Sequence, residues 1–426
     1  ASVGSANSSS ASATESAASA VTAADMAASM GAVSALFTSV ASASAAVIPF
    51  VITALRTSGY ATPGDGAALY KRAASEPSHA GKFQSVGGAW WELAEDRPTP
   101  AMFGGVSGGV TDCSTAFGNL IEYCRLRGVT GRASGIIRLN TCNFDLTRVA
   151  LEGDGEAITY SDTIPGSATV LAVYDTTNPG FKIGHSAKLS KLSIMYPDQL
   201  GRATPIAYPP TFQFTGSSAS GWDIRDVHVP CTYTLFSNPA ATVVGAGVVD
   251  NVRAFALSRY FEFFGGAPEV ILVSNSIFSP GAWLGDYLTA RTDLLRYGYD
   301  NTVLLYMNID AGASYRSIDG FTLGNSIVYG VRRLIDRVAG NIGPILFDGV
   351  HFDGIGQTMR ARGSDFISGL KITGNTTYVG GPADNSRVNN AINDPDIDIE
   401  VGGSASSNFS LSGYSYHGLG SSVRLA

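Results

Sequence analysis

Charged residues are scarce in this sequence. Only 15% of its 426 residues are Asp, Glu, Lys or Arg, whereas an average soluble domain has about 25%. The formal net charge of −7 argues against a nucleic-acid partner, because such partners are held by neutralising their phosphates. The 50 glycines and the 10% aromatic content instead indicate an apolar, glycine-punctuated, mostly β protein that is not disordered.

Cysteines are few and widely spaced. They are Cys113, Cys124, Cys142 and Cys231. They form no Cys-x-x-Cys pair and no cluster with histidine, so we expect buried reduced thiols, no metal site and no cofactor.

Long hydrophobic runs are missing too. The longest, residues 45–55, contains Pro49 and is too short to cross a bilayer, which takes about 20 apolar residues. No Lys or Arg occurs before Arg56, so no signal peptide is recognisable. We therefore expect no membrane insertion.

The first 46 residues are of low complexity, with 17 Ala and 13 Ser. Apolar residues within them alternate in steps of four and three, at Met26, Met30, Val33, Phe37 and Val40. This spacing is the seam of a coiled coil. We expect an Ala/Ser-rich stem over 1–48, with an intermolecular helix bundle over 21–47. The alternative is an unstructured linker, because the seam lasts little more than two heptads.

A loose hexapeptide repeat appears after about residue 130. Its seven copies begin at Leu189, Ile224, Val249, Val273, Ile318, Phe347 and Ile367. The first and sixth positions are apolar in every copy, and the fourth in six of them. The third position is occupied by Lys191, Asp226, Asn251, Asn275, Gly320, Gly349 and Gly369. Gly, Asn and Asp tolerate positive φ, so each copy predicts a sharp bend followed by a strand.

Recurring units of 20–30 residues with one bend are typical of solenoids, whose stacked coils bury a continuous core. We predict an all-β parallel solenoid over 101–400, with Asn251, Asn275, Gly320, Gly349 and Gly369 in register along one edge. Residues 49–100, rich in turns, predict a small β collar domain, and 401–426 a C-terminal β cap or tail. A β-sandwich is the alternative fold, although few two-residue hairpin turns are present.

One amphipathic helix is expected at about 112–127. Thr111 and Asp112 are good N-caps, and Gly128 is a typical end. Apolar residues at helical spacing are Phe117, Leu120, Ile121 and Cys124. Because the end of a solenoid exposes strand edges, we expect this helix to cap its N-terminal end.

A family resemblance lies in the same stretch. FGGVSGGVTDCSTAFGNLIEYC, followed by GIIRLNTCNFDL and VALEGDGEA, resembles the opening of the pectate-lyase-like right-handed parallel β-helices of bacteriophage tail spikes. The family pattern is Phe-Gly-Ala-x-Gly-Asp-Gly-x-Thr-Asp-Asp. Matching residues are Phe103, Gly104, Gly109, Thr111 and Asp112, and departures are Ser107, Gly108 and Cys113. The motifs cover about 100–200, and the repeat covers the remainder.

The resemblance implies a homotrimeric tail spike or tail fibre. Such a protein is assembled in the host cytoplasm, becomes part of the extracellular virion, and is attached to a phage baseplate or tail protein through its N-terminal stem. Its β-helix faces bacterial surface polysaccharide. The fold does not distinguish attachment from a polysaccharide depolymerase, a glycoside hydrolase or lyase, on the same scaffold.

Two carboxylates are the candidate catalytic pair. Asp319 and Asp348 share the second position of their repeats, so on adjacent coils their backbones would lie about 4.8 Å apart. Retaining glycosidases hold two carboxyl groups about 5–5.5 Å apart. Asp-Gly is, more commonly, plain turn chemistry. Asp353 and Glu262 are further candidate acids.

The insertion over 279–302 interrupts the repeat. Its candidate substrate-binding residues are Trp283, Tyr287, Arg291, Arg296 and Tyr297. Aromatic faces and guanidinium groups suit flat polar sugar rings, and binding groups collect on loops of rigid scaffolds. Packing between subunits is the alternative. Near the C-terminus, Asp396, Asp398 and Glu400 share one strand face, which indicates a solvated outer face rather than a calcium site.

Overall fold

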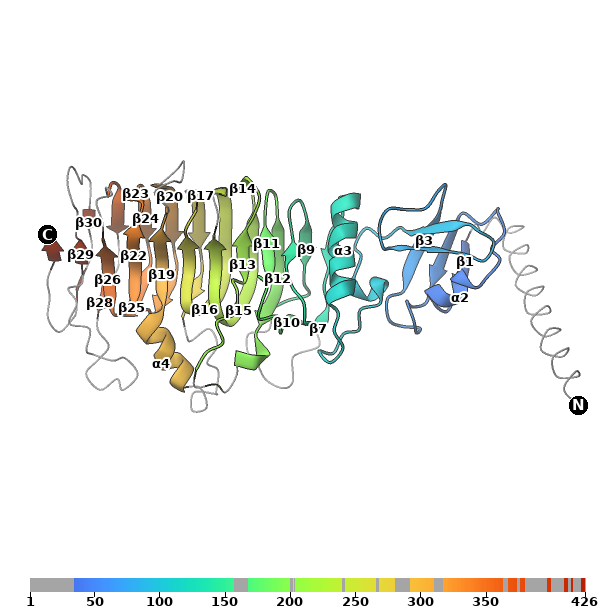
Figure 1. Ribbon diagram of the computed structural model, residues 1–426, viewed down its shortest axis with the longest axis horizontal. Helices are drawn as coiled ribbons and strands as arrows, with labels where there is room; N and C mark the ends of the chain where they lie inside the picture. Colours follow the sequence, from blue (N-terminus) through green and yellow to red (C-terminus); the bar gives the residue numbers. More distant parts are fainter. Residues whose placement is uncertain are drawn as a thin grey trace, which may run out of the picture. The chain divides into compact units, whose positions relative to one another are not determined.

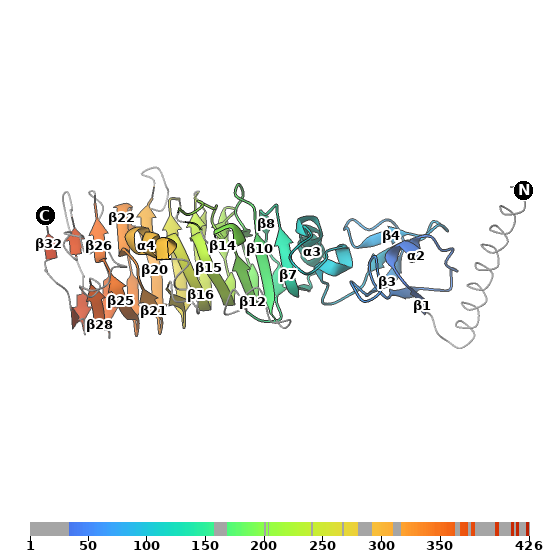
Figure 2. The ribbon, with the colours of Figure 1, turned by 90° about the horizontal axis from the view of Figure 1, so that it is seen from below.

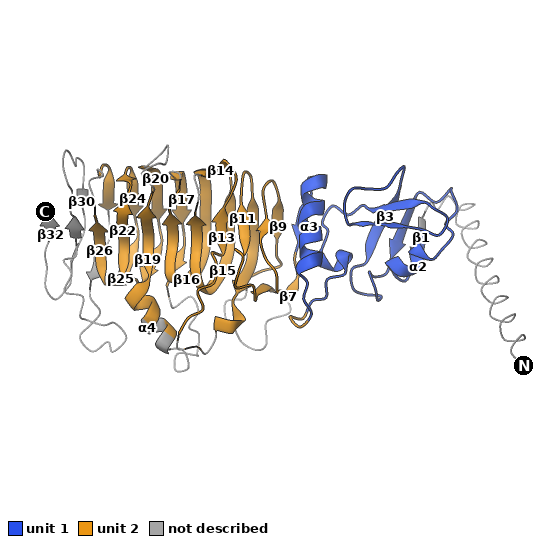
Figure 3. Ribbon diagram, viewed as in Figure 1, with its two compact units in different colours: residues 1–107, 111–132 blue, residues 108–110, 133–426 orange. Residues whose placement is uncertain are grey.

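The computed structural model describes residues 34–156, 168–199, 202, 204–239, 242–265, 268–279, 292–309, 317–362, 367–373, 376–379, 397–399, 410–412, 415–416 and 423–425. The chain divides into two compact units (Figure 3), residues 1–107 with 111–132, and residues 108–110 with 133–426. Among the described residues, none of the helices combines the length and the apolar character needed to span a membrane.

The first unit contains a five-stranded mixed sheet in the order β1-β2-β3-β5-β4. Its strands are β1 (Ser34–Phe37), β2 (Ala54–Thr57), β3 (Ala68–Ala73), β4 (Lys82–Gln84) and β5 (Trp90–Leu93). Strand β1 pairs in parallel with β2, and the other pairings are antiparallel. Tyr70, Phe83 and Trp91 are buried between the strands. The Arg72 guanidinium lies 4.6 Å from the centre of the Trp91 ring.

The predicted coiled coil is wrong over residues 34–47. Phe37 lies in strand β1, and Val40 begins α2 (Val40–Ser44), a helix of five residues. Ser39 caps this helix by accepting a hydrogen bond from the Ser42 amide. Phe37 and Val40, two positions of the predicted seam, therefore lie in different secondary-structure elements. The pairing of β1 with β2 is favoured here over the helix that the short heptad pattern predicts. The rest of the predicted stem, residues 1–33, lies outside the described residues.

The predicted helix is α3 (Ser114–Arg127), which belongs to the first unit. It starts two residues later than expected: Cys113 is the N-cap residue, and the Asp112 carboxylate accepts from the Ser114 amide at 3.0 Å. It ends at Gly128, with φ of 66°, as predicted. The four apolar residues of the predicted stripe are all buried. A role for α3 as a cap on the solenoid stays a prediction.

The second unit is a parallel β-helix (Figures 1 and 2). Each strand pairs in parallel with its equivalents one coil before and one coil after, which confirms the predicted solenoid. Most of the described strands form three sheets. Two short strands, β14 (Ser218–Ser220) and β23 (Asn341–Ile342), pair instead with the first residues of β16 and β20.

The first sheet contains β9 (Ala150–Glu152), the starts of β12 (Lys188–Met195) and β15 (Asp223–Asn238), the middle of β16 (Val243–Phe263), and β17 (Pro268–Ser274), β20 (Ser317–Gly324), β24 (Ile345–Asp348), β27 (Leu370–Thr373) and β30 (Ser410–Ser412).

The second sheet contains β7 (Gly135–Leu139), β10 (Thr169–Val173), later parts of β12, β15 and β16, and β18 (Ile277–Phe278), β21 (Ile327–Tyr329), β25 (His351–Ile355), β28 (Thr376–Val379) and β31 (Ser415–Tyr416).

The third sheet contains β8 (Phe144–Asp145), β11 (Phe181–Ile183), β13 (Phe212–Phe214), the ends of β15 and β16, and β19 (Val303–Asn308), β22 (Arg333–Ala339), β26 (Gln357–Ala361), β29 (Ile397–Ile399) and β32 (Val423–Leu425). Strands β30, β31 and β32 continue the three sheets to Leu425, so the β-helix does not end near residue 400 as predicted.

Two columns of residues with positive φ turn the chain at the two ends of the first sheet. Corner one, at its end, consists of Lys191, Asp226, Asn251, Asn275, Asn325 and Gly349. Corner two, at its start, contains Ser186, Gly221, Ala246, Val270, Gly320 and Gly369. The single predicted edge is therefore wrong for Gly320 and Gly369. Both corners read apolar-x-bend-apolar-x-apolar, so the sequence pattern does not separate them.

The core of the third sheet begins with a ladder of phenylalanines. Phe144, Phe181, Phe212, Phe236 and Phe261 occupy one rung position on successive coils. Their ring centres are 5.9, 6.1, 4.9 and 5.1 Å apart in that order. Each aromatic pair contributes about 0.5–1.5 kcal/mol beyond burial of its area. The ladder fills this part of the core continuously from coil to coil. The four cysteines are buried and free, as expected.

Candidate functional site

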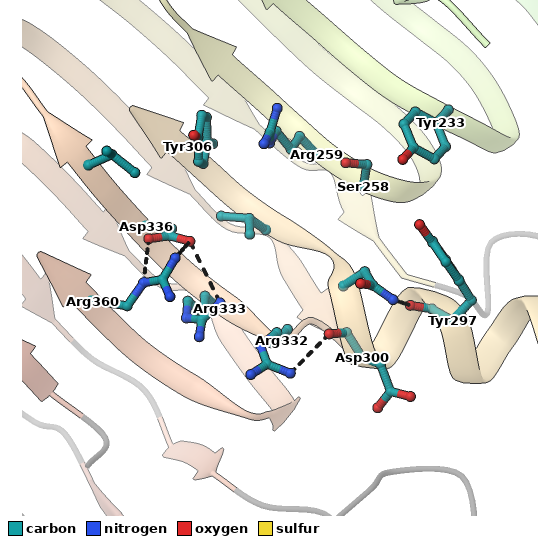
Figure 4. A pocket seen from close by; sticks show the side chains of 13 residues that line it. Tyr233, Ser258, Arg259, Tyr297, Asp300, Tyr306, Arg332, Arg333, Asp336 and Arg360 are labelled. Carbon is teal, nitrogen blue, oxygen red and sulfur yellow. Dashed lines mark hydrogen bonds and ion pairs between the residues drawn. The ribbon is translucent and has the colours of Figure 1, made fainter. Parts of the chain in front are cut away.

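A cavity of about 450 Å³ opens on the outer side of the third sheet, beside helix α4 (Thr292–Asn301) (Figure 4). We call it the α4 groove. It is lined by Tyr233, Ser258, Arg259, Tyr297, Asp300, Asn301, Val303, Tyr306, Arg332, Arg333, Asp336, Val338 and Arg360. Three tyrosines and four arginines make its wall both aromatic and cationic.

Strand register builds one wall of the groove. Glu262, Tyr306, Asp336 and Arg360 occupy the same rung on four successive strands of the third sheet. Neighbouring strands lie about 4.8 Å apart, so these outward side chains form a continuous row. The inward rung on one side of the row is filled by buried apolar residues, Phe261, Leu305, Ile335 and Met359. The packed interior therefore fixes the position of the polar row.

Asp336 is the buried anchor of this row. Its side chain is only 4% exposed. Arg360 donates two hydrogen bonds to it, from Nε at 2.8 Å and from Nη2 at 2.6 Å (Figure 4). Arg333 Nη1 lies 3.6 Å from Asp336 Oδ2, and Arg333 Nε donates to Gln357 Oε1 at 2.7 Å. Two guanidinium groups thus share one carboxylate, and the planar fork of Arg360 is held in a fixed orientation.

A second cationic group covers an aromatic ring. The Arg259 guanidinium carbon lies 3.7 Å from the centre of the Tyr306 ring, well within the range of a cation–π contact. Arg259 also pairs with Glu262, which accepts a hydrogen bond from Ser237 Oγ at 2.8 Å. Glu262 is 7% exposed. The ion pair with Glu262 therefore holds the Arg259 guanidinium over the Tyr306 ring.

Helix α4 forms the other wall. Its Leu294 packs into an apolar cluster with Cys231, Phe255 and Leu257. Gly298 allows close approach, because a Cβ there would lie 2.7 Å from the Phe255 ring. This packing positions the C-terminal end of α4, whose Asp300 and Asn301 line the groove.

The polar groups at the end of α4 are also tied together. Arg332 Nη1 donates to the Asp300 carbonyl oxygen at 3.1 Å, and Asn301 Nδ2 donates to the Tyr297 carbonyl oxygen at 2.8 Å. Burial raises the pKa of Tyr297 to about 12, and the hydrogen bond with Tyr233 adds to this. Tyr297 therefore stays a neutral hydroxyl at physiological pH.

Of the predicted substrate-binding residues, Tyr297 lies in the groove. Arg296 lies on α4, but its side chain is outside the described residues, as are Trp283, Tyr287 and Arg291. Glu262, one of the further candidate acids, lies beside the groove. Within the described residues, no three His, Cys, Asp or Glu side chains gather so that they could hold a metal ion.

The predicted juxtaposition of Asp319 and Asp348 is wrong. On β20, the strand that carries Asp319, the partner of Asp348 is Gly324, whereas Asp319 itself pairs with Glu269 one coil earlier. Asp348 lies just before corner one and Asp319 just before corner two, so the length of a first-sheet strand separates them. The remaining candidate acid, Asp353, pairs with Tyr329 on the second sheet. None of these three residues lines the α4 groove.

Sequence reasoning missed the arginines and Asp336 of the groove. A sequence signal that could have found them is a charged residue within a mostly apolar stretch. This signal occurs in three strands, at Arg259, Asp336 and Arg360. Aligning them requires the register of the third sheet, which the hexapeptide repeat does not reach. Asp398 pairs with Arg360 on the next strand of the third sheet, and the outer face predicted for Asp396, Asp398 and Glu400 stays a prediction.

Comparison with known proteins gives structural neighbours only. No protein-family model and no curated protein matches the chain. Among solved structures, the enzymatically active domain of bacteriophage CBA120 tailspike protein 4 has a TM-score of 0.48 and 15% identity, covering 91% of this chain and 49% of that one. Full-length tailspike protein 2 from Escherichia coli O157:H7 bacteriophage CAB120 has a TM-score of 0.47 and 11% identity, covering 81% and 46%.

A third neighbour is the tailspike gp49 of Acinetobacter baumannii bacteriophage Fri1, described as a capsular polysaccharide depolymerase. Its TM-score is 0.44 and its identity 14%, covering 80% of this chain and 66% of that one. The chain spans about half the length of the two CBA120 and CAB120 proteins. At these identities the likeness concerns the fold, and the strand pairing above establishes the parallel β-helix independently.

Proposed function

We propose that the protein is a phage tail spike or tail fibre protein that attaches to bacterial surface polysaccharide, and that the α4 groove is its glycan contact. The observation that carries the proposal is a groove lined by tyrosines and arginines on a rigid β-helix. The motif resemblance around Phe103–Cys124 supports the same class of protein. In this proposal the protein acts on the virion as a homotrimer, joined to a tail or baseplate protein through its N-terminal segment.

The chemistry of the groove suits a saccharide. A sugar ring has apolar C–H faces and a rim of hydroxyl groups, so it is bound by aromatic faces together with directional polar groups. Tyr306 and Tyr297 supply rings, and Arg332 and Asn301 supply polar groups. The volume of about 450 Å³ lies in the usual range for binding sites of about 300–1,000 Å³. Stacked strands also give an elongated surface that matches a polymer.

Attachment is favoured over hydrolysis by the contacts of Asp336, the buried carboxylate of the groove. A glycosidase needs one carboxyl group that can donate a proton and a second one at a defined separation. Asp336 accepts two charge-assisted hydrogen bonds from Arg360 and lies near Arg333, so both of its oxygens are already engaged by guanidinium groups. The predicted pair Asp319 and Asp348 is separated. Polysaccharide cleavage therefore remains an outcome of the test rather than the proposal.

The test is binding of the full chain to an array of capsular polysaccharides and lipopolysaccharides from many bacterial strains. We expect at least one glycan to bind, and Tyr306→Ala to weaken that binding by about tenfold or more, or 1.4 kcal/mol. A matched control is Tyr174→Ala, because Arg138 stacks on Tyr174 at 4.0 Å outside the groove. The proposal fails if no glycan binds, or if Tyr306→Ala and Tyr174→Ala behave alike. Chain-length analysis of the bound glycan reports any cleavage.

A further inference from the structure

Resting on the proposed function, we infer that the α4 groove selects polysaccharides carrying sugar carboxylates, and that Arg332 is the residue that meets the carboxylate. The starting observation is a local reversal of charge. The chain has a formal charge of −7, yet the guanidinium groups that line this groove outnumber the carboxylates by four to two.

Three of the four arginines that line the groove contact a carboxylate. Arg259 is matched by Glu262. Arg333 and Arg360 share the single carboxylate of Asp336. Two of these three groups, Arg333 and Asp336, are nearly buried.

Arg332 supplies the group that faces a ligand. It is half-buried, and its side chain donates to a backbone carbonyl, that of Asp300. Among the residues that the structure describes, no carboxylate lies within ion-pair distance of Arg332. Figure 4 shows the Asp300 carboxylate directed away from it. A half-buried guanidinium satisfied by a neutral oxygen leaves donors for an anion.

The geometry favours a carboxylate on a sugar. A guanidinium binds a carboxylate through two parallel hydrogen bonds, and the interaction strengthens where water is partly excluded. The tyrosine rings that line the same groove would contact the sugar faces, while the Arg332 guanidinium would bind the acidic substituent. A neutral sugar makes only the ring and hydroxyl contacts. Selection for acidic glycans follows from this difference.

The experiment compares each bound bacterial polysaccharide with the same polymer after chemical reduction of its carboxyl groups to primary alcohols. We expect the bound glycans to be acidic, and reduction to weaken binding by about tenfold or more, or 1.4 kcal/mol. Binding should also weaken as salt is raised, because ion pairs at a partly exposed site are screened. Equal binding of the native and reduced polymers, or binding confined to neutral glycans, overturns the inference and leaves attachment intact. Absence of binding to any glycan overturns the proposed function and the inference with it.

Variants locate the effect at one residue. Arg332→Gln is expected to weaken binding to the native acidic polymer about tenfold, and to weaken binding to the reduced polymer much less, because only a neutral hydrogen bond is lost there. Asp300→Asn is expected to tighten acidic binding, because it removes a nearby negative charge. The control is Arg225→Gln, which makes the same charge change on the first sheet, where Arg225 pairs with Asp223 and Asp250. If Arg225→Gln weakens binding as much as Arg332→Gln, net charge rather than the groove is responsible and the assignment to Arg332 is wrong.

Discussion

Asp336 and Arg360, one coil apart on the third sheet, are joined by two parallel hydrogen bonds of 2.8 and 2.6 Å between carboxylate and guanidinium. This pair links two coils through side chains where the backbone ladder already links them. It also fixes the direction of a guanidinium that lines the α4 groove. The same contact therefore bears on stability and on binding, and the two roles can be tested separately.

Asp336→Asn is expected to lower the free energy of unfolding by about 3 kcal/mol, the lower end for breaking a buried ion pair, since a third of the Arg360 side chain is exposed. The substitution leaves Arg360 and the nearly buried Arg333 without their carboxylate. Denaturant titration measures the change. The control is Asp223→Asn, whose partner Arg225 is exposed, with an expected loss of less than about 1 kcal/mol. Equal losses in the two variants would contradict the role of burial.

Tyr306→Phe separates the ring from its hydroxyl. Phenylalanine keeps the face on which Arg259 stacks, so glycan affinity is expected to stay within about threefold of the parent, or 0.7 kcal/mol. Titration calorimetry with a bound glycan measures this, and Tyr306→Ala serves as the comparison. If the phenylalanine variant binds as weakly as the alanine variant, the hydroxyl rather than the ring makes the contact.

Val270 occupies a position better suited to glycine. Its φ is 51°, an unusual value for a β-branched residue, and its side chain is 63% exposed. Val270→Gly removes left-handed strain of about 1–2 kcal/mol, offset by about 0.5–1 kcal/mol of glycine entropy. We expect a small gain in thermal stability.

The reciprocal change is Gly320→Val, one coil later in the same column. There φ is 129°, and a Cβ would lie 3.1 Å from the Val270 backbone nitrogen. We expect a loss of about 2 kcal/mol. A gain from Gly320→Val, or a loss from Val270→Gly, would show that the backbone at corner two relaxes freely.

The corners also show how far the sequence predicts the fold. Asn251, Asn275 and Gly349 can be recognised as bend residues from the sequence, because only a few residue types accept positive φ easily. Lys191 and Val270 take the same conformation because parallel pairing on both sides holds them there, and no local propensity reveals that. The sequence analysis placed Gly320 in one column with Asn251 and Asn275, because both corners have the same pattern of apolar and bend residues.

The groove was predictable only in part. Tyr297 was found because its segment interrupts the repeat. Asp336 and Arg360 were not, because they meet only through the register of the third sheet. That register depends on connections of unequal length, from Phe263 to Val303 and from Ala339 to Gln357, and alternation within one strand does not specify it.

Tyr208 gives a test of stability against pH. Burial raises its pKa to about 12, compared with about 10 in an unfolded chain. The folded state therefore keeps this proton while the unfolded state releases it, so the contribution is complete below about pH 10 and is lost as pH rises toward 12. Phenylalanine at this position has no proton to lose, and it keeps the ring contact with Tyr196 at 4.8 Å. The advantage of Tyr208→Phe over the parent should therefore grow between about pH 10 and 12.

At about pH 7 the variant should already be equal to the parent or more stable by about 1 kcal/mol, because the Tyr208 hydroxyl is buried with no hydrogen-bond partner among the described residues. Denaturant midpoints measured at about pH 7, 9 and 11 check both statements. Tyr329→Phe, the same substitution at a half-buried ring on the second sheet, is the matched control. A parallel decline of the parent and Tyr208→Phe above pH 10 would mean that other groups, and not this phenol, account for the alkaline loss.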